Sequence, residues 1–320
     1  MIQFVESNQL NPYLNIAVEQ WLVQNARPDC VTMYLWRNRR TVVIGMNQNP
    51  YSECNVAELE ADGGFLVRRK TGGGAVYHDD GNLNFSFVAP PDLYDVDKHF
   101  AVIRQALSHW GLEVEVSGRN DLTCFGRKIS GNAFSKSRSA CLHHGTLLIR
   151  SEMEELQRYL KVDKAKLMKH GVESVRSRVA NLSDFNPEIT SLRVVPSLRD
   201  AFEEVYADNC VKMGFEHISR REDVQAIARS YQDPEWLYGR WREFRADKKG
   251  RFEWGAVELS LQVDESAGRI IDAKIASDGL DLTAIDLAQK ALVGADIHQR
   301  PELPSVPHRH IVDDILSLVY

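Results

Sequence analysis

Short runs of apolar and β-branched residues, each bounded by turn-forming residues, constrain the fold of this chain more than any other feature. The runs cover residues 31–36, 41–45, 65–68, 83–89, 113–116, 121–125 and 145–149. Runs of this length and composition are typical of β-strands. We therefore expect 31–36, 41–45, 65–68 and 83–89 to be strands of one sheet, and 113–116, 121–125 and 145–149 to be further strands.

Helical patterns interrupt these runs. Asn11-Pro12 supplies a capping residue and a first-turn proline, and apolar residues then recur on one face, which predicts a helix over 12–25. The same periodicity predicts a helix over 97–110, where Gly111 follows as a stop signal. Further helices are expected at 152–160 and 198–207. Strands joined as hairpins, without strict alternation with helices, indicate an α+β fold.

Length and composition limit the class of protein. A chain of 320 residues that is 43% hydrophobic can fill a globular core in one large domain and one smaller domain. The net charge of −6 provides no general basic field, so we expect no nucleic-acid partner. No apolar run approaches the roughly 20 residues that span a bilayer, and five scattered cysteines fit a reducing compartment. We expect free thiols and a cytoplasmic protein without a membrane partner.

A change of pattern near residues 233–249 predicts a boundary or linker. This stretch is polar, aromatic and charged without a clear period. Beyond it, a strand pair is expected at 252–263 and 269–276, and helices are expected at 282–292 and 311–319. The carboxyl-terminal part should therefore be a smaller unit.

Three consecutive glycines follow three cationic residues, Arg68-Arg69-Lys70, with Thr71 between. Glycines 72–74 allow positive φ angles, and their exposed N–H groups can form an anion-binding nest beside the arginines. This combination suits a triphosphate or pyrophosphate. A tight surface turn with a solvated basic flank is the alternative reading, because the segment matches neither the P-loop nor the dinucleotide-binding fingerprint.

A second segment places Lys128 between small, turn-forming residues, where its ammonium can project from a strand or turn into a pocket. A fixed cation neutralises the charge that grows on a phosphate during adenylation. Asp121 is a candidate Mg²⁺ ligand, because Mg²⁺ uses one or two carboxylates together with phosphate oxygens. The alternative is a solvated lysine and an ordinary Asn120-Asp121 turn.

The third segment is Cys141-Leu142-His143-His144-Gly145, which enters an apolar strand. Adjacent histidines on a strand point to opposite faces, so at most one of them can line a pocket. Such a histidine can hydrogen-bond a carboxylate or a mixed anhydride, but a structural histidine fits the pattern as well. Cys141 has no obvious base beside it except this pair, so we interpret it as an ordinary buried cysteine rather than a nucleophile.

In this order, the segments resemble the lipoate-protein ligase A family over about the first 235 residues. The matching motifs are Arg68-Arg69, GGGAVYHDDGNLNFSF (72–87), SGRNDL (117–122), GRKISGNA (126–133), HHGTLL (143–148) and SVRSRVANL (174–182). Residues 234–239 and 251–263 resemble, more loosely, the accessory domain of the longer bacterial members. Two departures are Lys70-Thr71, where small residues are frequent, and Asn132, where serine is frequent.

This resemblance implies a mixed, largely antiparallel sheet flanked by helices, with a catalytic domain over 1–240 and a small α+β accessory domain over 247–320. The implied ATP contacts are Arg69, Gly74, Ala75, Val76, Tyr77 and Lys128. The implied lipoate contacts are Arg69, Gly73, Gly74, Lys128, His143 and Gly145. Lys128 is the implied catalytic residue, and Asn120 and Asp121 match a polar pair near the phosphates.

The implied reaction uses ATP and Mg²⁺ to convert lipoic acid to lipoyl-AMP and then transfers the lipoyl group to a lysine. The implied acceptors are the lipoyl domains of 2-oxoacid dehydrogenase complexes and the glycine-cleavage H protein, and we expect the enzyme to be a monomer. The alternatives are an ATP-independent octanoyl or lipoyl transferase that uses Cys141, a biotin ligase, and a noncatalytic sensor of the nucleotide or of lipoate.

Overall fold

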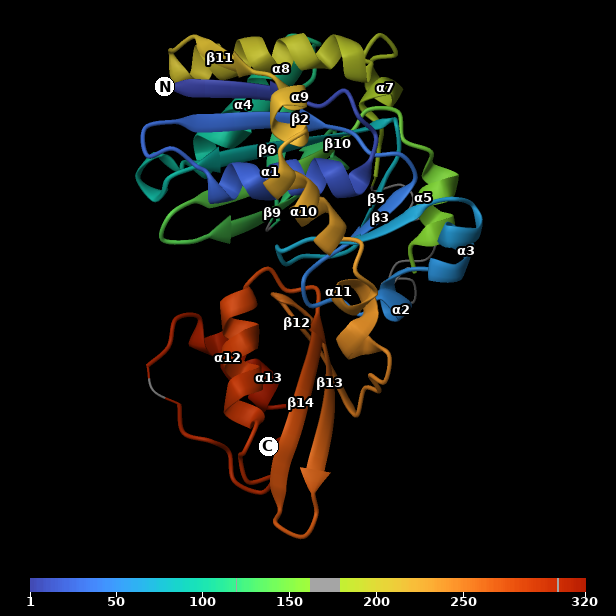
Figure 1. Ribbon diagram of the computed structural model, residues 1–320, viewed down its shortest axis with the longest axis vertical. Coiled ribbons are helices and arrows are strands. Elements are labelled where there is room, and N and C mark those ends of the chain that lie inside the picture. Colours follow the sequence, from blue (N-terminus) through green and yellow to red (C-terminus); the bar gives the residue numbers. More distant parts are fainter. Residues whose placement is uncertain (119, 162–178, 304) are drawn as a thin grey trace. The chain divides into compact units, whose positions relative to one another are not determined.

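The computed structural model describes residues 1–118, 120–161, 179–303 and 305–320, and the chain divides into two compact units (Figure 1). The large unit comprises Met1–Val43, Asn55–Val67 and Val76–Asp233. The small unit comprises Ile44–Cys54, Arg68–Ala75 and Pro234–Tyr320. The glycine-rich segment therefore belongs to the small unit, whereas Lys128 belongs to the large one.

An eight-stranded sheet forms the centre of the large unit, in the order β11-β1-β2-β6-β10-β9-β8-β7. Its strands are β1 (Ile2–Glu6), β2 (Val31–Trp36), β6 (Asn82–Ala89), β7 (Val114–Ser117), β8 (Asp121–Cys124), β9 (Arg127–Lys136), β10 (Cys141–Leu148) and β11 (Cys210–Met213). β1 pairs in parallel with β2 and β11, and every other pairing is antiparallel. The predicted mixed, largely antiparallel sheet is confirmed.

Helices cover both faces of this sheet (Figure 1). α4 (Val96–Ser108) and α8 (Ser191–Tyr206) pack on one face against apolar residues such as Phe85, Phe87 and Leu147. α1 (Pro12–Gln24), α9 (Phe215–Ser219) and α10 (Glu222–Ser230) pack on the other face against Tyr34 and Trp36. We call these the α4/α8 face and the α1 face. Successive strand residues alternate between them.

The expectation that 41–45 and 65–68 share one sheet with 31–36 and 83–89 is wrong, because the first two runs form a second, three-stranded sheet with the order β4-β3-β5. Its strands are β3 (Thr41–Ile44), β4 (Phe65–Arg68) and β5 (Val76–His78). The other helices that the structure describes in the large unit are short: α3 (Val56–Ala61), η1 (Pro91–Leu93), α5 (Met153–Tyr159) and α7 (Leu182–Phe185).

The small unit contains the antiparallel sheet β12-β13-β14 and two longer helices. Its elements are α2 (Pro50–Glu53), α11 (Pro234–Tyr238), η2 (Gly239–Trp241), β12 (Lys248–Phe252), β13 (Gly255–Asp264), β14 (Arg269–Ser277), α12 (Leu282–Leu292) and α13 (Arg309–Leu316). α12 and α13 cover the sheet through a core that includes Leu259, Ile275, Ile285 and Ile315, all 0–2% exposed.

The structure differs from the sequence prediction in several places, and the prediction did not include β1, β5, β11, α3, α9 or α10. β9 was expected only as a strand or turn around Lys128, β10 begins four residues before the predicted start, and α8 begins seven residues early in spite of Pro196. The predicted linker around 233–249 forms α11 and η2, because Leu237 and Trp241 are buried there. The motif at 174–182 begins outside the described residues.

Two further expectations concern membranes and thiols. Within the described ranges, no helix combines the length and the apolar character that a bilayer crossing requires. All five cysteines are free thiols, as the sequence predicts, and four of them are buried.

Candidate active site

A row of polar side chains lies on the α1 face of the large sheet. In the antiparallel pairing of β6 with β10, Ser86 is opposite His144 and Asn84 is opposite Thr146. Paired residues share one face, so these four side chains lie next to one another under α1. Ser86, Asn84 and His144 are buried, at 0%, 2% and 9% exposure. A buried polar row of this kind requires hydrogen-bond partners.

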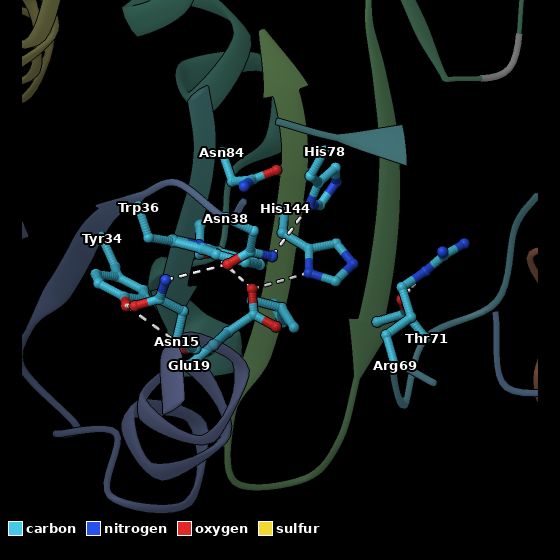
Figure 2. A network of polar contacts seen from close by, with 12 residues as sticks. Asn15, Glu19, Tyr34, Trp36, Asn38, Arg69, Thr71, His78, Asn84 and His144 are labelled. Atoms are coloured by element: carbon cyan, nitrogen blue, oxygen red, sulfur yellow. Dashed lines mark hydrogen bonds and ion pairs between the residues drawn. The ribbon is translucent and has the colours of Figure 1, made fainter. Parts of the chain in front are cut away.

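Glu19 of α1 is the hydrogen-bond partner of Ser86 and His144 in this row (Figure 2). Its Oε1 accepts a hydrogen bond from Ser86 Oγ at 2.6 Å and lies 2.9 Å from His144 Nδ1, which donates to the carboxylate. Trp36 Nε1 donates to Ser86 Oγ at 3.0 Å. Because Glu19 and His144 are only 5% and 11% exposed at the side chain, this hydrogen-bonded pair is held in one geometry.

A second set of buried amides holds His78 (Figure 2). Asn38 Nδ2 donates to His78 Nδ1 at 3.2 Å, and Asn15 Nδ2 donates to Asn38 Oδ1 at 3.1 Å. Trp36 contacts the His78 ring edge-on, with ring centroids 6.0 Å apart. Histidine, tryptophan and carboxylate side chains therefore pack together in this region.

Lys128 reaches the α1 face through a β-bulge. In the β8–β9 pairing Asp121 is opposite Gly131 and Leu122 is opposite Ser130, but Thr123 is opposite Lys128 because the register shifts there. Gly131 shares a face with its partner Asp121, and Lys128 is three residues away from Gly131 along β9. Without the extra residue, Lys128 would therefore point to the opposite face from Asp121. The bulge instead brings Lys128 Nζ to 2.7 Å from Asp121 Oδ1, with the two side chains 39% and 35% exposed.

Gly131 makes room for this lysine. A Cβ at Gly131 would lie 3.2 Å from Lys128 Nζ, so a larger residue would push the ammonium away. Gly131 N–H also donates to Thr146 Oγ1 at 3.2 Å, which joins the lysine hairpin to the polar row on β10. Lys128 and Asp121 thus lie on the same sheet face as His144.

His143 lies on the α4/α8 face, opposite to Lys128. It is 0% exposed and packs among Phe85, Phe87 and Phe134. Gly145 shares this face, and a Cβ there would lie 2.4 Å from Asn132 Oδ1 and 2.5 Å from Phe85 Cζ. The glycine is therefore required for close packing inside the core.

The glycine-rich segment is organised by its own arginine. Arg69 is 6% exposed, and its guanidinium donates to Thr71 Oγ1 at 3.0 Å, to the Gly72 carbonyl at 2.6 Å and to the Gly74 carbonyl at 2.8 Å. Gly73 has φ +91°, a conformation that favours glycine. Its N–H donates to the Gly279 carbonyl of the same unit at 3.2 Å. The loop is therefore tied to the residues that follow β14.

Arg68 has a structural position in the small unit. It is 2% exposed, and its guanidinium donates to the carbonyls of residues 45, 46, 48, 236 and 237. Burial and the nearby Arg240 lower the pKa of Arg68 to about 9, which still leaves it charged at neutral pH. Arg68 therefore joins α11 to the loop after β3.

Tyr77, predicted to contact ATP, lies in β5 with 2% exposure. Its hydroxyl donates a short hydrogen bond to Glu155, and burial together with Glu155 raises its pKa. Val76 precedes it in the same strand, and Ala75 ends the glycine segment in the small unit.

Two family models match most of the chain. The lipoyl protein ligase A/B catalytic domain matches residues 11–203, and the bacterial lipoate protein ligase carboxyl terminus matches residues 242–301. The lipoate-protein ligase A of Psychrobacter cryohalolentis is 38% identical over 298 residues, which cover 91% of this chain and 87% of that protein.

The chain belongs to the lipoate-protein ligase A family.

Other relatives agree with this lipoate-protein ligase A assignment. The lipoate-protein ligase A of Bdellovibrio bacteriovorus is 37% identical over 294 residues, covering 90% of this chain and 86% of that protein. The structure of P. falciparum LipL1 in complex with lipoate has a TM-score of 0.84 at 29% identity and covers 99% of this chain and 98% of that one. A lipoate-protein ligase A bound with ATP has a TM-score of 0.62 at 26% identity and covers 74% and 97%.

Sequence reasoning missed Glu19 and Trp36, and it could not choose between the two histidines. Alternation showed that the histidines point to opposite faces but could not show which face carries Lys128. The signal available for Glu19 was a carboxylate within the apolar pattern of a predicted amphipathic helix. Such a buried charge requires a partner, which here is His144.

Proposed function

We propose that this chain is an ATP-dependent lipoate-protein ligase that forms lipoyl-AMP and pyrophosphate and then transfers the lipoyl group to a lysine of an acceptor domain. The observation that carries the proposal is the β8–β9 bulge, which brings Lys128 to the α1 face beside the buried polar row. Relatives named lipoate-protein ligase A over about 90% of the chain support the same activity.

Activation requires a cation where charge develops. The lipoate carboxylate oxygen attacks the α-phosphorus of ATP, the bond to the β-phosphate breaks, and pyrophosphate leaves with the electron pair. The Lys128 ammonium, held beside Asp121, donates to an α-phosphate oxygen and stabilises the added negative charge. The side chain is 39% exposed, so a ligand can reach it without unfolding the hairpin.

We assign the acyl chain to the α1 face. His144, Trp36 and His78 provide ring surfaces for the aliphatic chain and dithiolane, while Glu19 keeps the His144 ring in place. The resemblance assigned this role to His143, but that ring packs in the core on the opposite face. We therefore propose His144 in its place, and we interpret Gly145 as a packing residue rather than a lipoate contact.

The phosphates of ATP are assigned to the glycine-rich segment and its flanks. Arg69, Gly73, Gly74, Ala75, Val76 and Tyr77 remain the proposed ATP and lipoate contacts. A Cβ at Gly74 would meet no atom within 4 Å, so the packing of the described residues does not explain this glycine, and close approach of a ligand would. Asp121 fits Mg²⁺, because the ion uses one carboxylate together with phosphate oxygens; among the described side chains, no group of three acidic, histidine or cysteine residues could hold a metal by itself.

In the second step the acceptor's lysine amine attacks the acyl carbon of the mixed anhydride, and AMP leaves. We propose lipoyl domains of 2-oxoacid dehydrogenase complexes and the glycine-cleavage H protein as acceptors. A structure from the analysis of a Thermoplasma acidophilum lipoylation system, which comprises a bi-partite lipoate protein ligase and its E2 lipoyl domain, is similar to 76% of this chain at 27% identity and TM-score 0.65. We further propose a cytoplasmic monomer with a catalytic domain over 1–240 and an accessory domain over 247–320.

Lipoate-dependent release of pyrophosphate tests this proposal. Purified protein with ATP and Mg²⁺ should release pyrophosphate only when lipoate is added, and an apo lipoyl domain should then gain the mass of one lipoyl group. Biotin in place of lipoate is the matched control and should give no release. Absence of lipoate-dependent release would instead favour the noncatalytic sensor.

Replacing Cys141 by alanine should leave both half-reactions within about twofold of the wild type, because ordinary buried substitutions act on stability rather than on rate. The thiol is 3% exposed and lies on the face away from Lys128. Acyl transfer to a lipoyl domain, measured with and without ATP, checks this expectation. Loss of transfer in Cys141→Ala, together with ATP-independent transfer in the wild type, would show the thioester mechanism instead.

A further inference from the structure

Two histidines face each other inside the core on the α4/α8 face. His99 of α4 and His143 of β10 are both 0% exposed, and their Nδ1 atoms are 3.2 Å apart. Burial lowers the pKa of His99 to about 3, and burial together with His99 and His144 lowers the pKa of His143. Both rings are therefore neutral at physiological pH. A hydrogen bond between them needs one Nδ1–H donor and one Nδ1 acceptor.

Asn132 determines which ring donates. Its Oδ1 lies 3.0 Å from His143 Nε2, while its Nδ2 donates to the Asn120 carbonyl at 3.0 Å and to Ser130 Oγ at 3.3 Å. Because the amide oxygen can only accept, His143 carries its proton on Nε2 and accepts on Nδ1. His99 then donates from Nδ1. The three side chains form a relay with a single direction, from His99 through His143 to Asn132.

Asn132 also hydrogen-bonds Asn120, the residue directly before β8. Asn132 N–H donates to the Asn120 carbonyl at 2.8 Å, Asn132 Nδ2 donates to the same carbonyl, and Asn120 Nδ2 donates to the Asn132 carbonyl at 2.5 Å. Asn120 directly precedes Asp121, whose carboxylate holds Lys128 at 2.7 Å. Three hydrogen bonds thus fix the backbone next to the carboxylate that orients the lysine.

Gly145 leaves the space through which the Asn132 side chain reaches His143. The Asn132 side chain passes over this residue, where a Cβ would lie 2.4 Å from its Oδ1. A serine at position 132 would have a shorter side chain and could not make both the His143 and the Asn120 contacts.

We propose that Asn132, His143 and His99 are positioning residues for the activation step, and that they hold Asp121 and Lys128 in the geometry that receives the α-phosphate. This inference rests on the proposed function. None of the three side chains touches substrate, because all of them lie on the α4/α8 face. A lysine displaced by about 1 Å is enough to lower the rate about 100-fold, so the relay affects turnover rather than affinity for lipoate.

Asn132→Ser tests the proposal. We expect the kcat of lipoate-dependent pyrophosphate release to fall about 10- to 100-fold, with the KM for lipoate changed less than about twofold. The matched control is Asn186→Ser, which removes a half-buried amide with two hydrogen bonds to backbone atoms far from the hairpin in sequence. It should lower thermal stability without lowering kcat. An unchanged kcat in Asn132→Ser, or an equal fall in both variants, would overturn the proposal.

Variants of His143 test the same positioning role with a second residue, so the result does not depend on Asn132→Ser alone. His143→Phe breaks the relay, and combined with Asn132→Ser it should lower kcat no further than Asn132→Ser alone. His143→Gln retains an N–H donor for Asn132 and should recover most of the rate. Additive losses, or a His143→Gln rate no better than that of His143→Phe, would contradict a shared positioning role.

A nitrogen NMR measurement of the histidine tautomers provides a readout that does not depend on activity. His143 should carry its proton on Nε2 and His99 on Nδ1 in the wild type. The opposite tautomers would overturn the relay even if the variants lose activity. If the wild type releases no lipoate-dependent pyrophosphate, the proposed function fails, whereas the tautomers and the Asn132–Asn120 hydrogen bonds remain measurable.

Discussion

Lys128→Met is expected to lower the rate of lipoate-dependent pyrophosphate release about 100- to 1,000-fold, because it removes the cation that stabilises charge on the α-phosphate. Stability should change little. The Lys128–Asp121 pair is more than a third exposed on both side chains, and exposed ion pairs contribute about 0–1 kcal/mol. Pre-steady-state measurement of lipoyl-AMP formation separates this effect from slow product release.

Lys136→Met is the matched control, because it makes the same substitution at an exposed position near the end of β9. It should retain the wild-type rate. If Lys128→Met forms lipoyl-AMP as fast as this control, then Lys128 is a surface lysine and the proposed activation site is wrong.

Arg68→Lys is expected to lower the free energy of unfolding by about 3 kcal/mol, because it leaves several buried carbonyl groups without a donor. The arginine fork reaches five carbonyls, with distances from 2.6 Å at Gln48 to 3.1 Å at Met46. An ammonium has three donors on one atom and cannot reach acceptors on both sides of a planar guanidinium. Urea unfolding of the full chain, followed by tryptophan fluorescence, measures the loss.

The control for this substitution is Arg242→Lys. Arg242 is 54% exposed and lies 3.7 Å from the exposed Glu235, so its replacement should change stability by less than about 0.5 kcal/mol. Equal stability of Arg68→Lys and Arg242→Lys would contradict the structural role of Arg68. It would also return Arg68 to the set of proposed phosphate ligands, which the sequence alone allowed.

Local sequence signals predicted the elements whose residues all favour one structure. Asn11-Pro12 begins α1 where expected, and the Asn11 side chain accepts hydrogen bonds from residues 13 and 14. The run at 65–68 is a strand with the predicted bounds. In both cases the capping or β-branched residues and the hydrophobic periodicity favour the same element. Tertiary contacts therefore did not change the element that the local sequence favours.

The candidate site was harder to predict, because its geometry comes from pairing between strands. Ser130, Gly131 and Asn132 favour turns locally, yet they lie inside β9, where the glycine makes room for Lys128 and the asparagine spans to His143. The bulge that turns Lys128 toward Asp121 depends on the register with β8. A sequence shows which residue types are available. It does not show which residues of different strands lie on the same face of a sheet.

Binding of the adenylate's α-phosphate by Lys128, on the α1 face of the large sheet, is the central claim. A crystal structure of the protein with lipoyl-AMP tests it most directly. We expect Lys128 Nζ within about 3 Å of a phosphate oxygen and the acyl chain against His144. An adenylate bound away from Lys128 would contradict the account.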